Sequence, residues 1–133
     1  MHTTVKGQIG VAKAIADLLA RGLDVFVPVL ASSPYDLLVK SSNDQYIKVE
    51  VKYRNLPVNG VIKFHPVRMA LGRKRYYTYR INTVPDVVCI YCPQTDACYY
   101  VENQASISLR FKPTKNNQLQ HIKQASDYRE FPR

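Results

Sequence analysis

The chain has 133 residues, of which 46% are hydrophobic, so it is long enough for one globular domain and too apolar for a disordered tail. No stretch has the roughly 18 apolar residues of a membrane span, and the N-terminus lacks the pattern of a signal peptide, so we expect a cytoplasmic protein without a membrane partner. Three cysteines, an odd number, argue against a disulfide framework. The net charge of +9 favours a polyanionic partner.

The positive charge is concentrated in the middle of the sequence. Residues 53–80 carry seven basic side chains and no acidic one, whereas residues 1–52 are almost balanced. A solvated surface usually mixes its signs, so a block of one sign is more typical of a surface that contacts phosphates. We therefore expect the following residues to bind nucleic acid: Arg54, Lys63, Arg68, Arg73, Lys74, Arg75 and Arg80.

Residues 4–20 have the apolar spacing of an amphipathic helix. Thr3 or Thr4 is the expected N-cap, and Gly22 the residue that ends the helix. The expected buried stripe consists of Val5, Ile9, Ala12, Ala16 and Leu19, widened by Val11, Ile15 and Leu18.

Short β-branched and alternating segments follow the helix and predict a sheet. An α-β-β-β order followed by a β-hairpin predicts an α/β fold, with a mixed β-sheet and flanking helices. Helical segments are expected near 67–77 and 115–126. The expected strands are 24–30, 35–40, 45–53, 61–64, 86–92 and 97–101, with a further strand-like segment at 107–111.

The third strand carries the residues with the clearest chemical pattern. Glu50 and Lys52 are two residues apart, so their side chains leave the same face of the strand. Asp36 belongs to the preceding strand, and the short turn between the two predicts an antiparallel hairpin that brings the three side chains together. Two carboxylates so placed can share Mg²⁺, with the carbonyl of Val51 as a further ligand, and a nearby lysine can hold the attacking water.

These residues resemble the PD-(D/E)xK nuclease superfamily. Pro34-Tyr35-Asp36, thirteen further residues and then Glu50-Val51-Lys52 follow its motif, and the motif lies on the helix and hairpin that its restriction-endonuclease-like core uses. The stretches KGQIG, PYDLLVK, IKVEVKYR and DVVCIYCPQTDACYYV are similar to a small group of these nucleases that includes a homing endonuclease encoded in a cyanobacterial group I intron.

The resemblance implies a metal-dependent endonuclease that cuts double-stranded DNA in the site-specific manner of homing enzymes. It implies that Asp36 and Glu50 hold Mg²⁺, for which Mn²⁺ can substitute, and that Lys52 orients the water. Members of the superfamily often add a glutamate from the first helix. This chain has Gln8 near that position, a weaker ligand, so a second metal ion is in doubt and Gln8 is a candidate catalytic residue.

Other interpretations of the same residues stay open. Alternating Lys and Glu side chains are common on solvated strand faces, where they form cross-strand ion pairs. A Holliday junction resolvase has a similar length and charge, and a catalytically inactive DNA-binding module on a nuclease scaffold is a third possibility. Cys89, Cys92 and Cys98 are a poor zinc site, because residues three apart on a strand point to opposite faces.

The predicted organisation is a nuclease core at residues 1–101 followed by a basic extension at residues 102–133. We expect this extension to contact DNA or a neighbouring subunit. A double-strand cut needs two active sites, so a homo-oligomer, a dimer or a tetramer, is expected.

Overall fold

The computed structural model describes residues 1–64, 85–104, 106–112 and 123–132. Helix α1 at Thr3–Ala20 comes first in the chain. The strands are β1 (Asp24–Phe26), β2 (Leu37–Lys40), β3 (Tyr46–Tyr53), β4 (Val61–Phe64), β5 (Val87–Cys92), β6 (Ala97–Glu102) and β7 (Ile107–Arg110), and a 3-10 helix follows at Ala125–Tyr128. In the described part of the chain, no helix is long and apolar enough to cross a membrane.

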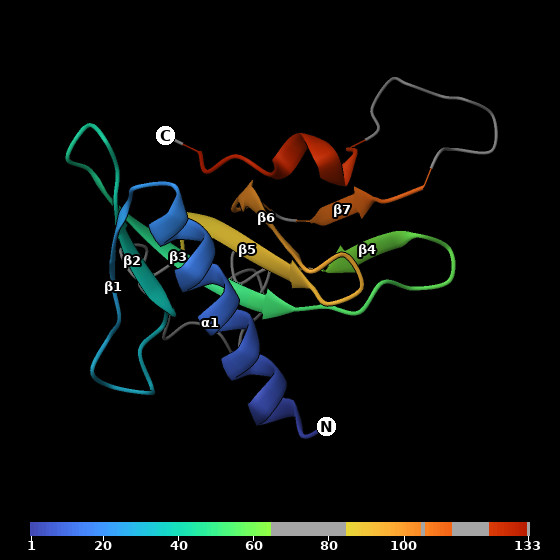
Figure 1. Ribbon diagram of the computed structural model, residues 1–133, viewed down its shortest axis with the longest axis horizontal. Coiled ribbons are helices and arrows are strands. Elements are labelled where there is room, and N and C mark those ends of the chain that lie inside the picture. Colours follow the sequence, from blue (N-terminus) through green and yellow to red (C-terminus); the bar gives the residue numbers. More distant parts are fainter. Residues whose placement is uncertain (65–84, 105, 113–122, 133) are drawn as a thin grey trace, which may run out of the picture.

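The main sheet is mixed, which confirms the predicted fold class. Its five strands are ordered β1-β2-β3-β5-β6. The β2–β3 and β5–β6 pairs are antiparallel, whereas β3 and β5 are parallel neighbours. Helix α1 crosses in front of β3 and β5 (Figure 1), and the antiparallel pair β4–β7 forms a separate two-stranded sheet. The buried face of β3 is therefore covered by the first helix of the chain.

The bounds of α1 agree with the prediction, but its cap and its buried face do not. His2 is the N-cap and accepts a hydrogen bond at Nδ1 from the backbone of Thr4, 3.1 Å away, so the expected threonine caps are wrong. Gly22 follows the helix with a φ of +79°, as a residue in the left-handed region should.

The helix face that packs on the sheet is centred on three small or branched residues. Gly10, Ala14 and Leu18 are buried, and Ile9, Val11 and Ile15 pack beside them. The buried face is therefore rotated around the helix relative to the predicted one. Of the residues predicted to be buried, Val5 and Leu19 are about half exposed, and Ala12 and Ala16 are exposed. The error arose because a hydrophobicity pattern gives Gly10 no weight, although it marks the closest approach of the helix.

Two buried clusters lie on the two faces of the sheet. The cluster beneath α1 includes Val49, Cys89 and Cys98, whereas the opposite cluster includes Cys92 together with Ile62 and Leu109 from the small sheet. The three cysteines are free and buried, and they do divide between the two faces as the strand geometry predicts.

Several expected elements differ from the structure or lie outside its described residues. The strand expected at 24–30 ends at Phe26, two residues before Pro28, which cannot donate to a sheet. The helix expected at 67–77 lies outside the described residues, as does most of the one expected at 115–126. The described end of the latter is a β-bridge at Gln124 followed by the 3-10 helix.

The described parts of residues 102–133 pack onto the same cores as the earlier residues. Strand β7 pairs with β4, and Ile107, Leu109 and Ala125 join the cluster opposite α1. Phe131 is 5% exposed and packs edge-on against Tyr100, with ring centroids 5.4 Å apart. The segment near the C-terminus thus returns to the main sheet (Figure 1).

Candidate active site

Asp36 lies in the bend directly before β2, which begins at Leu37 and not at Tyr35 as expected, and two hydrogen bonds join Asp36 to β3. Its backbone N–H donates to the carbonyl of Val49 at 2.9 Å, and its carboxylate Oδ2 accepts from the backbone N–H of Val51 at 2.7 Å. Since the N–H and C=O of one residue leave an extended strand on the same edge, the carbonyl of Val51 points to the edge where Asp36 lies. The hairpin therefore brings Asp36 beside the Glu50-Val51-Lys52 segment.

Glu50 and Lys52 form an ion pair on β3. Lys52 Nζ lies 2.9 Å from Glu50 Oε1, and the exposed fractions of the two side chains are 31% for Lys52 and 13% for Glu50. The second carboxylate oxygen, Oε2, is buried and has no hydrogen-bond partner among the residues that the structure describes. Such an oxygen normally finds a partner in a folded protein, so this carboxylate is an exception that calls for an explanation.

The two catalytic candidates on β3 face away from α1. Val49 and Val51 pack in the cluster beneath the helix, so the alternation of the strand directs Glu50 and Lys52 to the opposite face. In the parallel register, Glu50 is opposite Val88 and Lys52 opposite Ile90, which belong to the other cluster. The pair is therefore set beside apolar side chains, which limits its contact with water.

Gln8 lies on the α1 side of the sheet and meets Asp36 at a shared cavity. This cavity of about 370 Å³ lies between α1 and the β1–β2 connection. Glu50 and Lys52 do not line it. Asp36 thus shares a cavity with Gln8 and is bonded to the backbone of β3 at Val49 and Val51. The lining residues are Gln8, Val11, Ala12, Ile15, Val27, Pro28, Leu30, Ala31, Tyr35 and Asp36.

The oxygens at this edge fit a hard divalent cation. Glu50 Oε2 is a buried carboxylate oxygen without a donor among the described residues, and Asp36 is bonded to Val51, the residue that follows Glu50 in the chain. Mg²⁺ prefers one or two carboxylates together with waters and substrate oxygens over a full protein cage. Among the described residues, no group of three or more His, Cys, Asp or Glu side chains is placed to hold a metal ion.

Two of the seven basic residues expected to bind nucleic acid are described. Arg54 follows β3 directly: its N–H donates to the carbonyl of Tyr91 at 2.9 Å and its guanidinium to the carbonyl of Tyr53 at 3.0 Å. Lys63 is exposed on β4. The remaining five, Arg68, Arg73, Lys74, Arg75 and Arg80, lie outside the described residues.

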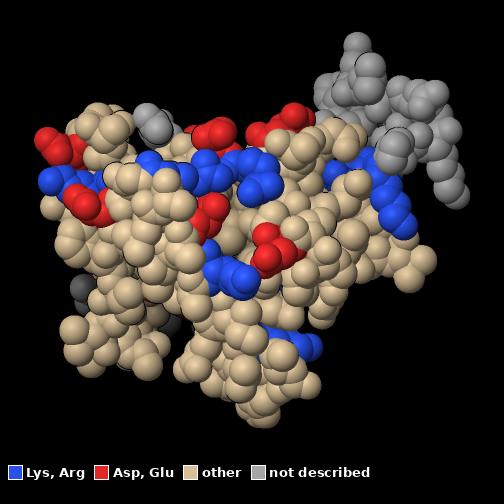
Figure 2. Space-filling view, viewed as in Figure 1, with Lys and Arg blue, Asp and Glu red and all other residues tan. Residues whose placement is uncertain are grey.

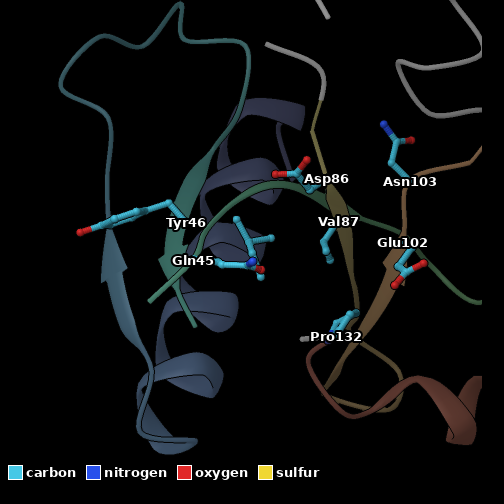
Figure 3. A pocket seen from close by; sticks show the side chains of 8 residues that line it. Gln45, Tyr46, Asp86, Val87, Glu102, Asn103 and Pro132 are labelled. Atoms are coloured by element: carbon cyan, nitrogen blue, oxygen red, sulfur yellow. The ribbon is translucent and has the colours of Figure 1, made fainter. Parts of the chain in front are cut away.

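A larger cavity, of about 640 Å³, lies at the opposite end of the sheet, where β3 and β5 begin (Figure 3). Its acidic residues are Asp86 and Glu102, and Asp86 is already engaged by the backbone N–H of Lys48 at 2.9 Å. None of the residues expected to act in catalysis lines this cavity. It is therefore separate from the candidate active site.

Two lysines of α1 that the sequence analysis did not single out lie over the ends of β3 and β5, on the face of the sheet opposite Glu50 and Lys52. Lys6 Nζ is 5.9 Å from the centroid of the Tyr53 ring, and Lys13 Nζ is 5.8 Å from that of Tyr91. The Tyr91 hydroxyl donates to Asp96 at 2.7 Å, and this hydrogen bond, together with burial, raises the pKa of Tyr91 to about 12. The seven-residue spacing of Lys6 and Lys13 predicts that they lie on the same face of the helix, and this is the sequence signal that could have identified them.

Comparison with known proteins bears on the fold and the family of the chain. The structure of the bacterial homing endonuclease I-Ssp6803I matches with a TM-score of 0.61 and 21% identity, covering 97% of this chain and 89% of that one. The Holliday junction resolvase Hjc of Archaeoglobus fulgidus matches with a TM-score of 0.49 and 14% identity, covering 79% and 84%. No curated protein matches the chain. The sequence profile of PD-(D/E)XK endonucleases matches residues 1–131, so the chain belongs to the PD-(D/E)XK endonuclease family.

Proposed function

We propose that this protein is a metal-dependent endonuclease that hydrolyses phosphodiester bonds of double-stranded DNA. The observation that carries the proposal is the environment of Glu50, a largely buried side chain that pairs with Lys52 through one oxygen and whose other oxygen, itself buried, has no partner among the described residues. A purely structural ion pair gains nothing from a buried oxygen without a donor. An oxygen reserved for a cation explains it.

The residues divide the chemistry among them. Asp36, Glu50 and the carbonyl of Val51 would hold Mg²⁺, or Mn²⁺ in its place; such an ion polarises the phosphate and lowers the pKa of a bound water. Lys52 would orient the attacking water and neutralise charge on the pentacovalent transition state. Gln8 is proposed as a further catalytic residue on the strength of the cavity that it shares with Asp36.

The binding surface and the assembly belong to the same proposal. We propose that the seven basic residues from Arg54 to Arg80 contact the DNA backbone. The basic segment at 102–133 would contact DNA or a second subunit, and a homo-oligomer would supply the two active sites of a double-strand cut. Site-specific homing activity is proposed because the chain shares its fold with a homing endonuclease.

Cleavage of a substrate panel tests this proposal. Purified protein is incubated with a plasmid library and with a four-way junction, in Mg²⁺ or in EDTA, alongside an Asp36→Asn variant. Asparagine keeps an oxygen that can accept the hydrogen bond from Val51 but has no charge for a cation, so the hairpin should persist while the cation is lost.

We expect cutting of a subset of plasmids in Mg²⁺, none in EDTA and none by Asp36→Asn. A contaminating nuclease would survive the substitution. Cutting of the junction in preference to linear duplex would make the enzyme a resolvase. Tight DNA binding without cutting of any substrate would show a binding module instead.

A further inference from the structure

The lysines of α1 lie over the ends of the two parallel strands at the centre of the sheet. Tyr53 ends β3 and is opposite Tyr91 of β5 in the register, and the two ring centroids are 5.7 Å apart. Lys6 lies over the first ring and Lys13 over the second, at distances at which a cation is attracted to an aromatic face. Basic side chains are visible over this α1-bearing side of the molecule (Figure 2).

Gly10 sets the position of these lysines relative to the candidate active site. A Cβ built on Gly10 would lie 3.4 Å from Cγ1 of Val51 and 3.6 Å from Cβ of Tyr53, so the helix touches β3 at this point. Lys6 and Lys13 are on the same helix face, one turn on either side of Gly10. Lys6 therefore lies over the end of β3, two residues beyond the Val51 that is bonded to Asp36, and Lys13 lies over β5 and its turn to β6.

The two lysines differ in their present partners. Lys13 Nζ is 2.9 Å from Asp96 Oδ1, and the hydroxyl of Tyr91 donates to the same oxygen. Lys6 pairs with no carboxylate among the described residues, and the first turn of α1 carries no acidic side chain. One lysine is thus ready to meet an anion, and the other is held by a carboxylate that an anion could replace.

We propose that Lys6 and Lys13 form a second line of contacts to the DNA backbone along α1, with Asp96 competing with the phosphate for Lys13. This inference rests on the proposed nuclease function. Seven residues of helix span roughly 10 Å, which is about the axial rise of three phosphates on one DNA strand. The spacing therefore suits two separate phosphates of a strand that runs along α1.

Substitutions with opposite expected signs test the proposal. Affinity for a short fluorescein-labelled duplex is measured in EDTA over a range of salt concentrations, for Lys6→Gln and Asp96→Asn. The matched controls are Lys40→Gln and Asp44→Asn, which remove the members of an exposed ion pair at the β2–β3 turn. Asp44 and Asp96 both have a positive φ, of 64° and 48°, and asparagine tolerates this conformation. Neither substitution by asparagine should therefore strain the backbone.

We expect Lys6→Gln to weaken binding about twofold to fivefold and to reduce the slope of log affinity against log salt by about 0.9. Asp96→Asn should strengthen binding and steepen that slope, because Lys13 is then free to displace a further counterion. All variants should still cut plasmid in Mg²⁺, which shows that they are folded. If the wild type binds the duplex and cuts plasmid while either test variant has the affinity of its control, the proposed contact of α1 with DNA is wrong and the nuclease function stands. If the wild type neither binds nor cuts DNA, both proposals are wrong.

Discussion

At the scale of single residues, Glu50 and Lys52 place two opposite charges beside apolar neighbours. Burying a carboxylate oxygen without a donor costs free energy, and Oε2 of Glu50 has no donor among the described residues. Proteins retain such exceptions mainly where function needs them. The stability of this site should accordingly depend on what binds there.

Glu50→Gln should abolish the rise in melting temperature that a divalent cation causes in the wild type. If Mn²⁺ binds the folded wild type at about 100 times its dissociation constant, it adds ~2.7 kcal/mol to the free energy of unfolding, which raises the melting temperature by several degrees. The glutamine variant should show almost no rise in calorimetry with and without Mn²⁺. Glu102→Gln, an exposed carboxylate on β6, should respond like the wild type; an equal rise in Glu50→Gln would mean that the cation binds elsewhere.

Tyr91 should make stability fall at alkaline pH. Its hydrogen bond to Asp96 raises its pKa to about 12, whereas an unfolded tyrosine has a pKa of about 10. The folded state therefore holds the proton more tightly, so this contribution is complete below about pH 10 and is lost as the pH rises towards about 12. Urea unfolding of the wild type should show a steeper decline over this interval than unfolding of Tyr91→Phe, and parallel curves would contradict the assignment.

At the scale of elements, the contact of α1 with β3 holds the candidate active site in shape. Val51 is touched by the helix at Gly10 on one face and bonded to Asp36 along its edge. Leu18 and Ala14 bury the rest of the same helix stripe. A substitution that moves α1 away from β3 should therefore shift Val51 and with it the hydrogen bond to Asp36.

Two glycines of α1 should respond to substitution in opposite directions. Gly7 has no atom within 4 Å of an added Cβ, so Gly7→Ala should raise the free energy of unfolding by about 0.5–1 kcal/mol through helix propensity alone. Gly10→Leu should lower it by about 1–3 kcal/mol, because the side chain has to displace Val51 or Tyr53. Urea denaturation measures both, and a Gly10→Leu variant as stable as Gly7→Ala would disprove the close packing.

Local patterns predicted the elements well and their packing less well. Helix periodicity and β-branched alternation are local, so α1, the β2–β3 hairpin and the β5–β6 hairpin could be located before the structure was known. The spacing of Asp36, Glu50 and Lys52 similarly predicted that one hairpin brings them together. The pairing of β4 with β7, and the position of Lys13 beside Asp96, join residues far apart in the chain and leave no local signal.

At the scale of the whole molecule, residues near the C-terminus contact the end of α1 and the core beneath it. Arg21 of the α1 C-cap bonds Asp17 at 3.0 Å and Glu130 at 3.1 Å, and its guanidinium also donates to the carbonyl of Arg129. Phe131 belongs to the cluster beneath α1. The described end of the 102–133 segment is thus part of what stabilises the sheet, whatever it contacts outside the chain.

Phe131→Ala should destabilise the entire domain. Removing a buried phenylalanine costs about 3–5 kcal/mol, and this ring also loses its edge-on contact with Tyr100. Glu130→Gln is the matched control, because that side chain is 90% exposed and an exposed ion pair contributes about 1 kcal/mol or less. One cooperative urea transition at lower denaturant is expected for Phe131→Ala, and an unchanged transition would show that the tail is independent of the core.

The proposed division of the molecule, with carboxylates on the hairpin for a cation and basic residues beside them for phosphates, depends above all on Lys52. The most direct measurement is the single-turnover rate of DNA cleavage in Mg²⁺ by saturating Lys52→Ala, compared with the wild type and with Lys48→Ala, a lysine on the same face of the same strand. We predict a fall of about 10²–10³ in the rate constant for Lys52→Ala, with DNA affinity in EDTA nearly unchanged, and little change for Lys48→Ala. Equal cleavage rates for Lys52→Ala and the wild type would contradict the assignment of this hairpin as the active site.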